Sequence, residues 1–285
     1  MALKRLVTPK HADVGMPVLR LLPREGQRSV GPFVFLDHFG PMVPPAGKGD
    51  ILSHPHIGLA TVTFLFSGEM LHKDSLGTVQ RIVPGDINWM TAGRGIVHAE
   101  RLPETVRAKG EAMHGLQLWV ALPRAHEEGP PGFWHHPAET LPTVEGDGVR
   151  ARVMVGEAFG KVSPVRTPMQ TIYVSAELKA GATFTVTSRE AERAVYAVEG
   201  ELEIDGTKVS THDLAVLEQG ESKVRAHGPA KLVVLGGEPL DGPRHMWWNF
   251  VSSDPTRLDA ARDSWKTGGF VMPPGETERT PAPDL

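Results

Sequence analysis

Two pairs of residues with the same spacing carry the strongest chemical signal in the sequence. The first pair is His54 and His56, and the second, further along the chain, is His98 and Glu100. Residues two apart on a strand point to the same face, so each pair can direct both side chains into one cavity. Three imidazoles and one carboxylate suit a divalent first-row transition metal. The pattern therefore predicts a metal site formed by these four side chains on adjacent strands.

Each pair alone has a simpler interpretation. A His-x-His pair is more often a surface or capping feature than a ligand set, and a single His-x-Glu pair is weaker still. Here, however, both pairs lie near glycines within a pattern of strands and turns. Pro55 lacks a backbone donor, which is typical of an edge or bulged strand. Together the pairs favour a metal site whose free coordination positions can accept dioxygen or a substrate oxygen.

The composition predicts a turn-rich β protein of one large domain or two smaller ones. Hydrophobic residues make up 40% of the 285 residues and charged residues 22%, which is enough apolar material for a sizeable core. The chain holds 31 glycines and 25 prolines, and most glycines lie between short apolar runs. This alternation is typical of many short strands joined by turns.

Charge and cysteine content exclude several classes of function. The net charge is −4 and the sequence has no basic block, which argues against nucleic-acid binding. The absence of cysteine excludes disulfides, thiolate metal sites, iron–sulfur clusters and a cysteine nucleophile. The first twenty residues lack an unbroken apolar core, and no run of ~18 apolar residues occurs. We expect a cytoplasmic protein that does not bind membranes.

Short apolar runs predict an all-β fold with a single helix. The strand-like runs are bounded by Gly, Pro, Asp or Ser and include 61–66, 116–122, 171–174, 195–198 and 232–235. The helix is expected near the C-terminus, where Asp254 can cap it, Pro255 occupies the first turn, and three apolar residues share one face: Leu258, Ala261 and Trp265. The proline-rich tail over 273–285 is expected to be extended or loosely packed.

The two halves of the sequence resemble each other. Residues 64–69 (FLFSGE) are similar to 196–201 (YAVEGE), and 85–87 (GDI) to 212–214 (HDL). This repeat predicts tandem barrels. The expected domains are an N-terminal metal-binding barrel over 1–133, a linker over 134–148, and a C-terminal barrel with helix and tail over 149–285. At the offsets of the repeat, the second half has no ligand set, because the corresponding residues are Val186, Ser188, Arg225 and His227.

Other histidines and tryptophans have structural interpretations. His135 and His136 are adjacent and would face opposite ways on an extended segment, so joint ligation is not expected. His72 and His114 are candidates for the pocket, but both are isolated in sequence, and an isolated histidine is usually structural. The pair at 247–248 (WW) is expected to pack against the core or between the barrels. Four apolar residues are candidates for the walls of the metal cavity or for the core: Phe64, Phe66, Trp89 and Met90.

The residues around the predicted ligands carry a family resemblance. Residues 49–68 resemble the first cupin motif, with a Gly, His-x-His and a distal Gly, and residues 85–98 resemble the second. More narrowly, HPHIGLATVTFLFSGE and PGDINWMTAGRGIVHAER are similar to the pirin family, from about residue 31 to the C-terminus. The resemblance implies two tandem cupin barrels of the jelly-roll type.

The pirin resemblance also implies a cofactor and a function. It maps the iron ligands to His54, His56, His98 and Glu100, with Fe(II) as the expected metal and Mn, Ni, Cu or Zn left open by competing affinity and availability. It implies quercetin 2,3-dioxygenase activity on a flavonol-like or other enolic or aromatic substrate. Glu100 is then a candidate catalytic residue that accepts the substrate's hydroxyl proton.

An alternative follows from the same resemblance. It is a non-enzymatic, iron-dependent and redox-sensing regulator that binds a protein partner. Under either function the chain is expected to be a monomer. The sequence also departs from the family pattern, which has Arg and Glu where this chain has Ile57 and Ala60. These two departures predict a less charged pocket rim and a more apolar organic ligand.

Overall fold

The protein consists of two β-barrels, each built from a seven-stranded and a four-stranded antiparallel sheet. The computed structural model describes residues 3–45, 48–187 and 189–284. The short apolar runs of the sequence become strands whose buried and exposed residues alternate most clearly where one face meets solvent, as in β23 (Ser222–Ala226). The prediction of an all-β fold with two cupin barrels is confirmed.

The first barrel contains the predicted ligands. In spatial order, the strands of its larger sheet are β12 (Gly132–His136), β9 (Ile87–Thr91), β6 (Leu59–Ser67), β11 (Met113–Ala121), β4 (Phe33–Met42), β3 (Pro17–Leu22) and β2 (Lys10–Asp13). The strands of its smaller sheet are β5 (Ile51–His56), β10 (Ile96–Arg101), β7 (Met70–Asp74) and β8 (Val79–Ile82). These two sheets supply every residue of the candidate site described below except a carbonyl from residue 249.

The second barrel repeats this arrangement. Its larger sheet is formed by β1 (Leu3–Val7), β22 (Leu214–Leu217), β19 (Glu192–Glu199), β24 (Ala230–Gly237), β17 (Thr171–Leu178), β14 (Val149–Val155) and β13 (Thr143–Gly146). Its smaller sheet is formed by β18 (Thr183–Val186), β23, β20 (Leu202–Ile204) and β21 (Thr207–Val209). Two short hairpins complete the described strands: β15 (Glu157–Ala158) with β16 (Lys161–Val162), and β25 (His245–Trp247) with β26 (Phe250–Ser252).

The strand orders of the two barrels correspond one to one. The similar segments found in the sequence lie on β6 and β19, the third strand of each larger sheet, and β9 and β22 are their neighbours. In both barrels the outermost strand of the larger sheet comes from a distant part of the chain, β12 beside β9 and β1 beside β22. The sequence repeat therefore reflects a repeat of topology.

By their contacts the residues fall into two compact units that alternate along the chain. One unit combines residues up to 12 with 19–37 and 139–239, and the other combines 13–18, 38–138 and 240–285. The domain boundaries predicted from sequence follow chain order instead, and the predicted linker over 134–148 carries the end of β12 and all of β13. The difference arises because terminal segments of the chain, such as β1, pair with strands far away in sequence.

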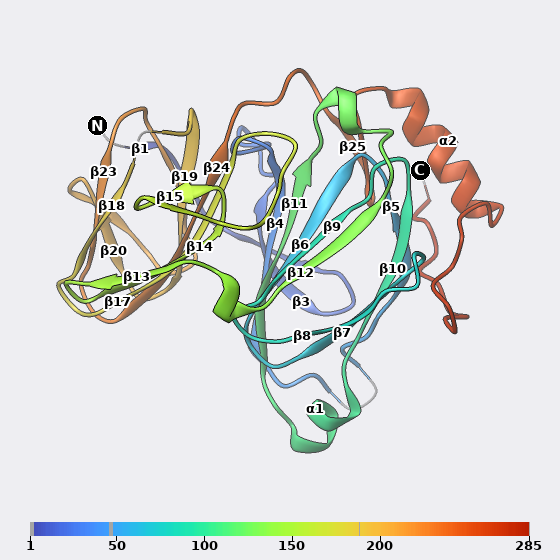
Figure 1. The fold of residues 1–285 in the computed structure, drawn as a ribbon, viewed down its shortest axis with the longest axis horizontal. Helices are drawn as coiled ribbons and strands as arrows, with labels where there is room; N and C mark the ends of the chain where they lie inside the picture. Colours follow the sequence, from blue (N-terminus) through green and yellow to red (C-terminus); the bar gives the residue numbers. More distant parts are fainter. Residues whose placement is uncertain (1–2, 46–47, 188, 285) are drawn as a thin grey trace. The chain divides into compact units, whose positions relative to one another are not determined.

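Two α-helices and two 3₁₀ turns accompany the described strands. The helix predicted near the C-terminus is α2 (Pro255–Lys266), whose N-cap Asp254 accepts a hydrogen bond from the backbone N–H of Thr256. Its three predicted core residues are buried, and it lies next to β25 (Figure 1). The expectation of a single helix was wrong, because α1 (Glu104–Lys109) is also present; at six residues it is too short to show helical periodicity. The 3₁₀ turns are η1 (Arg124–His126) and η2 (Ala138–Thr140).

The C-terminal tail is extended, which is one of the two predicted alternatives, and a few of its residues contact the smaller sheet of the first barrel. Glu276 forms ion pairs with Lys73 at 2.9 Å and with Arg101. The backbone N–H of Thr280 donates to the carbonyl of Ser53 at 2.8 Å, next to the first predicted ligand. The tail therefore stabilises the edge strand β5.

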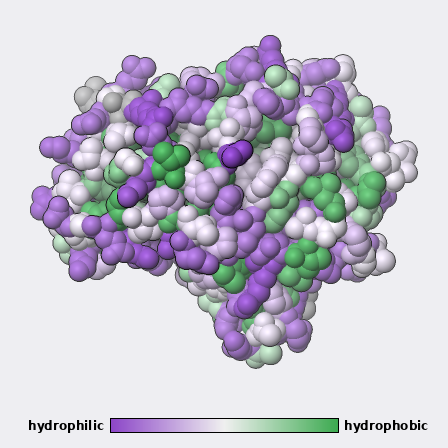
Figure 2. Space-filling model, viewed as in Figure 1, coloured by the Kyte–Doolittle hydropathy of each residue, from purple (hydrophilic) through white to green (hydrophobic). Residues whose placement is uncertain are grey.

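The described surface is mixed in polarity. Figure 2 shows hydrophilic side chains over most of one face, with hydrophobic ones scattered in small groups. No helix among the described residues is both long and apolar enough to cross a membrane. The cytoplasmic location remains a prediction.

Candidate metal centre

Three of the four predicted ligands meet in the interior of the first barrel. On the antiparallel pair β5 and β10, His54 lies opposite His98, and His56 lies opposite Ile96. The side chains of His54, His56 and His98 are 8%, 1% and 1% exposed. One nitrogen from each ring lies within 4.8 Å of the other two. As predicted from Pro55, β5 is an edge strand of its sheet.

The outer nitrogens of two of these rings are held by backbone carbonyls. His54 Nδ1 lies 2.8 Å from the carbonyl oxygen of Leu52, and His56 Nδ1 lies 3.0 Å from that of Asn249. A carbonyl only accepts hydrogen bonds, so both Nδ1 atoms carry the hydrogen and both Nε2 atoms have a free lone pair. This is the tautomer that a histidine needs when Nε2 is the metal ligand.

The inner nitrogens are close enough to need a shared cation or proton. His56 Nε2 lies 3.1 Å from His98 Nε2. Two lone pairs at this distance repel each other, whereas a divalent ion that accepts both removes the repulsion. The donor set of three imidazoles, with outward hydrogen bonds on the outer nitrogens, fits a transition metal such as Fe(II).

The electrostatic environment keeps the three histidines neutral. The pKa of His54 is lowered to about 4, chiefly by burial and also by the nearby His72, while the hydrogen bond to the carbonyl of Leu52 acts in the opposite direction. Burial and the neighbouring histidines also hold the pKa values of His56 and His98 well below their usual range. Metal ligation requires neutral imidazole, so near pH 7 no proton has to be displaced from these rings.

Glu100, the fourth predicted ligand, is buried nearby but lies outside the group of converging atoms. The pairing of β10 with β5 shifts register between His98 and Glu100. The Glu100 side chain therefore does not point in the same direction as that of His98, as it would on a regular strand. Its Oε1 lies 3.0 Å from the hydroxyl of Thr63, which also lies 2.9 Å from Gln117 Oε1. Burial raises the pKa of Glu100. Because a hydroxyl has one hydrogen, Thr63 donates to only one of these two oxygens at a time.

The sequence interpretation missed a second pair beside the histidines. His72 Nε2 lies 3.1 Å from Asp74 Oδ2, and His72 Nδ1 lies 3.4 Å from His98 Nδ1. Burial acts to raise the pKa of Asp74, but hydrogen bonds from His72 and Thr78 outweigh it, so the net pKa is lowered and the carboxylate is charged. The signal was available, because His72 and Asp74 have the same i, i+2 spacing as the predicted ligand pairs.

The walls of the site differ from the predicted ones. Met90 lies opposite Thr61, which shares its face of β6 with Thr63, so Met90 is on the side of the histidines. Three of the predicted wall residues are on the opposite face of the sheet and pack away from the cluster of His54, His56 and His98: Phe64, Phe66 and Trp89. Sequence analysis did not identify two aromatic walls: the Trp119 ring is 5.3 Å from that of His56, and the Phe133 ring stacks on His72 at 4.4 Å.

Ile57 is not part of a pocket rim, which corrects the prediction made from its departure from the family pattern. It is 1% exposed and packs with Phe250, Leu258 and Trp265 in the cluster beneath α2. Ala60 is fully buried on β6. The two departures therefore concern packing beneath α2 and in the sheet, and they give no information about the charge of the ligand.

The remaining candidates have structural roles. His135 lies 2.8 Å from Asn88 Oδ1 through its Nδ1 atom, and Nε2 of His114 lies 2.7 Å from that of His38. The rings of Trp247 and Trp248 contact each other and the ring of Phe250, as expected for packing.

In the second barrel the corresponding interior is apolar. The buried side chains of its smaller sheet include Phe184, Val186, Val224 and Ala226, which belong to one hydrophobic cluster. Arg225 is exposed on β23, so the constant offset that placed it at the position of His98 is out of register by an odd number of residues. His227 is exposed and lies 3.7 Å from Glu203. Ser188 lies outside the described residues.

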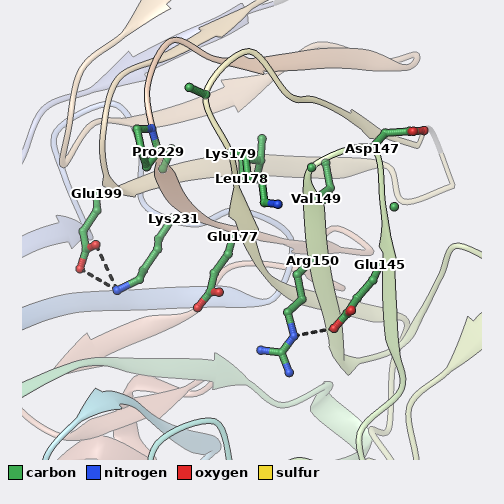
Figure 3. Close-up of a pocket in the computed structure, with 14 residues that line it drawn as sticks. Glu145, Asp147, Val149, Arg150, Glu177, Leu178, Lys179, Glu199, Pro229 and Lys231 are labelled. Atoms are coloured by element: carbon green, nitrogen blue, oxygen red, sulfur yellow. Dashed lines mark hydrogen bonds and ion pairs between the residues drawn. The ribbon is translucent and has the colours of Figure 1, made fainter.

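A hollow of about 700 Å³ is present in the second barrel. Five charged residues of alternating sign lie on neighbouring strands beside the hollow, each opposite the next: Glu145, Arg150, Glu177, Lys231 and Glu199. Figure 3 shows the ion pairs at the two ends of this ladder, Arg150 with Glu145 at 2.8 Å and Lys231 with Glu199 at 3.1 Å. Opposite charges on neighbouring strands stabilise a sheet, which accounts for the ladder.

Two cupin barrels with one histidine cluster in the first define the chain as a bicupin with a single candidate metal centre among its described residues. Comparison with protein families matches residues 15–120 to Pirin and residues 173–271 to the Pirin C-terminal cupin domain. The chain belongs to the pirin family.

Individual relatives cover nearly the whole chain. It is 45% identical to a pirin-like protein of Caulobacter vibrioides over 93% of each chain. It is 36% identical to a Pseudomonas aeruginosa protein named provisionally as a quercetin 2,3-dioxygenase, over 92% of this chain and 83% of that one. The crystal structure of quercetin 2,3-dioxygenase from Acinetobacter baumannii is similar with a TM-score of 0.91 and 35% identity, over 99% of this chain and 95% of that one.

Proposed function

We propose that the protein is a mononuclear, metal-dependent dioxygenase of the quercetin 2,3-dioxygenase type. The proposed metal is Fe(II), and its proposed protein ligands are His54, His56 and His98, with Glu100 as the fourth. The observation that carries the proposal is the convergence of three buried imidazoles whose inner nitrogens are within 4.8 Å of one another. The names of similar proteins support the reaction type. Iron is the metal that the resemblance of the sequence to pirins implies.

The residues of the site have distinct roles in this proposal. The three imidazoles hold the ion, which when bound supplies Lewis acidity and a template for a substrate oxygen and dioxygen. Glu100 accepts the proton of a substrate hydroxyl, because a buried carboxylate with a raised pKa is a stronger base than an exposed one once it is ionised. Thr63 and Gln117 hold that carboxyl group in place. Met90, Trp119 and Phe133 offer apolar surface to an aromatic ring.

The proposal is tested by metal content and oxygen uptake. Protein purified without chelator should contain about one transition-metal ion per chain by elemental analysis, and it should consume dioxygen when a flavonol such as quercetin is added. His98→Ala should lose both the ion and the oxygen uptake. His227→Ala is the matched control, because His227 is an exposed histidine of the second barrel, and it should retain both.

Two results would contradict the proposal in different ways. A chain without stoichiometric metal contradicts the metal centre. A chain that holds one ion but consumes no dioxygen with any enolic or aromatic substrate contradicts the dioxygenase. In the second case, partner binding that differs between the reduced and oxidised forms would support an iron-dependent regulator instead.

A further inference from the structure

One of the three histidines is held differently from the other two. The outer nitrogens of His54 and His56 face peptide carbonyls, which fix the tautomer directly. The outer nitrogen of His98 instead faces Nδ1 of His72 at 3.4 Å. An imidazole nitrogen can donate or accept, so the tautomer of His98 depends on that of His72.

Asp74 determines the tautomer of His72. Its Oδ1 accepts hydrogen bonds from the backbone N–H groups of Leu76 at 2.9 Å and Thr78 at 3.0 Å, which fix the carboxylate in the turn after β7. Its Oδ2 faces His72 Nε2 at 3.1 Å, and Asp74 is fully buried. A carboxylate only accepts, so His72 Nε2 carries the hydrogen and, in the neutral ring, Nδ1 is the acceptor.

The same logic continues to His98. When Nδ1 of His72 accepts, it favours the His98 tautomer whose Nδ1 donates, and this leaves the lone pair of His98 Nε2, 3.1 Å from His56 Nε2, for a cation that both nitrogens bind. Stacking of Phe133 on His72, at 4.4 Å and with an angle of 21° between the rings, holds the plane of the intermediate ring. In the second barrel, β20 and β23 are the strands equivalent to β7 and β10. They pair Ile204 with Val224, and neither strand contains a histidine.

We propose that Asp74 and His72 form a positioning pair that holds His98 in the tautomer required for ligation through Nε2. The inference rests on the proposed function in one respect, namely that His98 is a metal ligand. Carboxylate–histidine–metal arrangements commonly set the tautomer of a ligand. Here one further imidazole lies between the carboxylate and the ligand.

Asp74→Asn provides the sharpest test, because its effect on shape is minimal. The two backbone N–H groups of the turn keep the amide oxygen of Asn, so its NH₂ group faces His72 and donates to Nε2. His72 then carries its hydrogen on Nδ1 and forces that of His98 onto Nε2, which blocks ligation. We expect Asp74→Asn to lower the affinity for Co²⁺ by about 10- to 100-fold, measured by visible absorption in competition with a chelator.

A second variant separates positioning from packing. His72→Leu removes the ring that transmits the tautomer and leaves His98 free to adopt either form, so its loss of Co²⁺ affinity should be smaller than that of the isosteric Asp74→Asn. Adding His72→Leu to Asp74→Asn should restore the affinity to the level of His72→Leu alone. A purely structural role predicts the reverse order, since removing a ring from a core disturbs packing more than exchanging a carboxylate oxygen for an amide.

The control and the direct readout use the same preparations. Asp86→Asn changes a buried carboxylate that lies 3.6 Å from His135, a histidine outside the cluster, and should leave the Co²⁺ affinity unchanged. Imidazole ¹⁵N NMR of metal-free protein reads the tautomer of His72, because without a cation His98 Nε2 can carry the hydrogen that lies between it and His56 Nε2. It should show hydrogen on Nε2 of His72 in the wild type and on Nδ1 of His72 in Asp74→Asn. An Nδ1–H tautomer of His72 in the wild type, or unchanged Co²⁺ affinity in Asp74→Asn, overturns the inference. Failure of the wild type to bind Co²⁺ contradicts the proposed metal centre, and the NMR measurement still decides the tautomer.

Discussion

The two barrels of this protein have the same strand order and opposite interiors. In the first, the smaller sheet directs His54, His56 and His98 inward with His72 and Asp74 behind them. In the second, the equivalent sheet contributes Phe184, Val186, Val224 and Ala226 to a hydrophobic cluster. The topology therefore does not depend on the polar site, because the second barrel has the same strand order around an apolar interior.

The polar interior has structural requirements that the apolar one lacks. Each buried imidazole must have a partner for its outer nitrogen, because an unpaired buried polar group costs about 1 to 3 kcal/mol. The first barrel supplies these partners from Leu52, Asn249 and His72. The segment that contains Asn249 comes from the end of the chain, so the cluster requires the correct packing of a distant segment. The apolar barrel needs only complementary shapes.

The largest expected effect comes from giving the first barrel an apolar interior. The triple variant His54→Phe, His56→Val and His98→Val should fold with an unchanged circular dichroism spectrum and lose its metal entirely, from about one ion per chain to none by elemental analysis. Because only one partner of each hydrogen bond is replaced, the carbonyls of Leu52 and Asn249 lose their donors, and the free energy of unfolding should fall by about 1 to 3 kcal/mol for each. Stoichiometric metal in the triple variant would show that the ion binds elsewhere and would remove the functional contrast between the barrels.

A cavity in the second barrel should affect stability but not metal binding. Phe184 is 4% exposed, and Phe184→Ala should lower the free energy of unfolding by about 3 to 5 kcal/mol in a urea titration. Metal content per folded chain should stay at the wild-type value. Phe184→Leu serves as the control and should cost less, because it leaves a smaller cavity. Loss of metal from folded Phe184→Ala would mean that the two interiors are coupled.

The stability of the metal-free protein should fall with decreasing pH because of the buried histidines. His54 has a pKa of about 4 in the folded protein against an ordinary value of 6.5, so below pH 6.5 the unfolded state binds more protons and stability is lost as the pH falls. For this group alone, the loss between neutral pH and pH 4 is about 3 kcal/mol. Urea titrations of the wild type and His54→Phe should diverge by this amount on acidification. If the stability of the wild type and that of His54→Phe fall equally on acidification, His54 is not the buried, neutral imidazole assigned here.

The sequence was sufficient to predict the fold and three of the site residues, because period-2 spacing translates directly into a shared face of a strand. It could not place Glu100 as precisely, because the shift in register between β10 and β5 has no signature in the residues around it. It also left His72 as an isolated histidine, since the contact with His98 exists only once β7 pairs with β10. The division of the chain into two units whose segments alternate could not be predicted either, because it also depends on long-range strand pairing. The pairing of β1 with β22, for example, joins residues from opposite ends of one unit's sequence.

The smallest expected effect concerns the charge ladder that crosses the hollow of the second barrel (Figure 3). Lys231 lies opposite Glu177 and forms an ion pair with Glu199, and the two side chains of the ion pair are 35% and 46% exposed. Lys231→Ala should therefore lower the free energy of unfolding by about 0.2 to 1 kcal/mol, and high salt should reduce the difference, because exposed pairs are screened. Lys231→Met retains the aliphatic stem and isolates the charge. A larger, salt-independent loss would show that the ladder is desolvated, and the second barrel would then contain a polar element as demanding as the histidine cluster of the first.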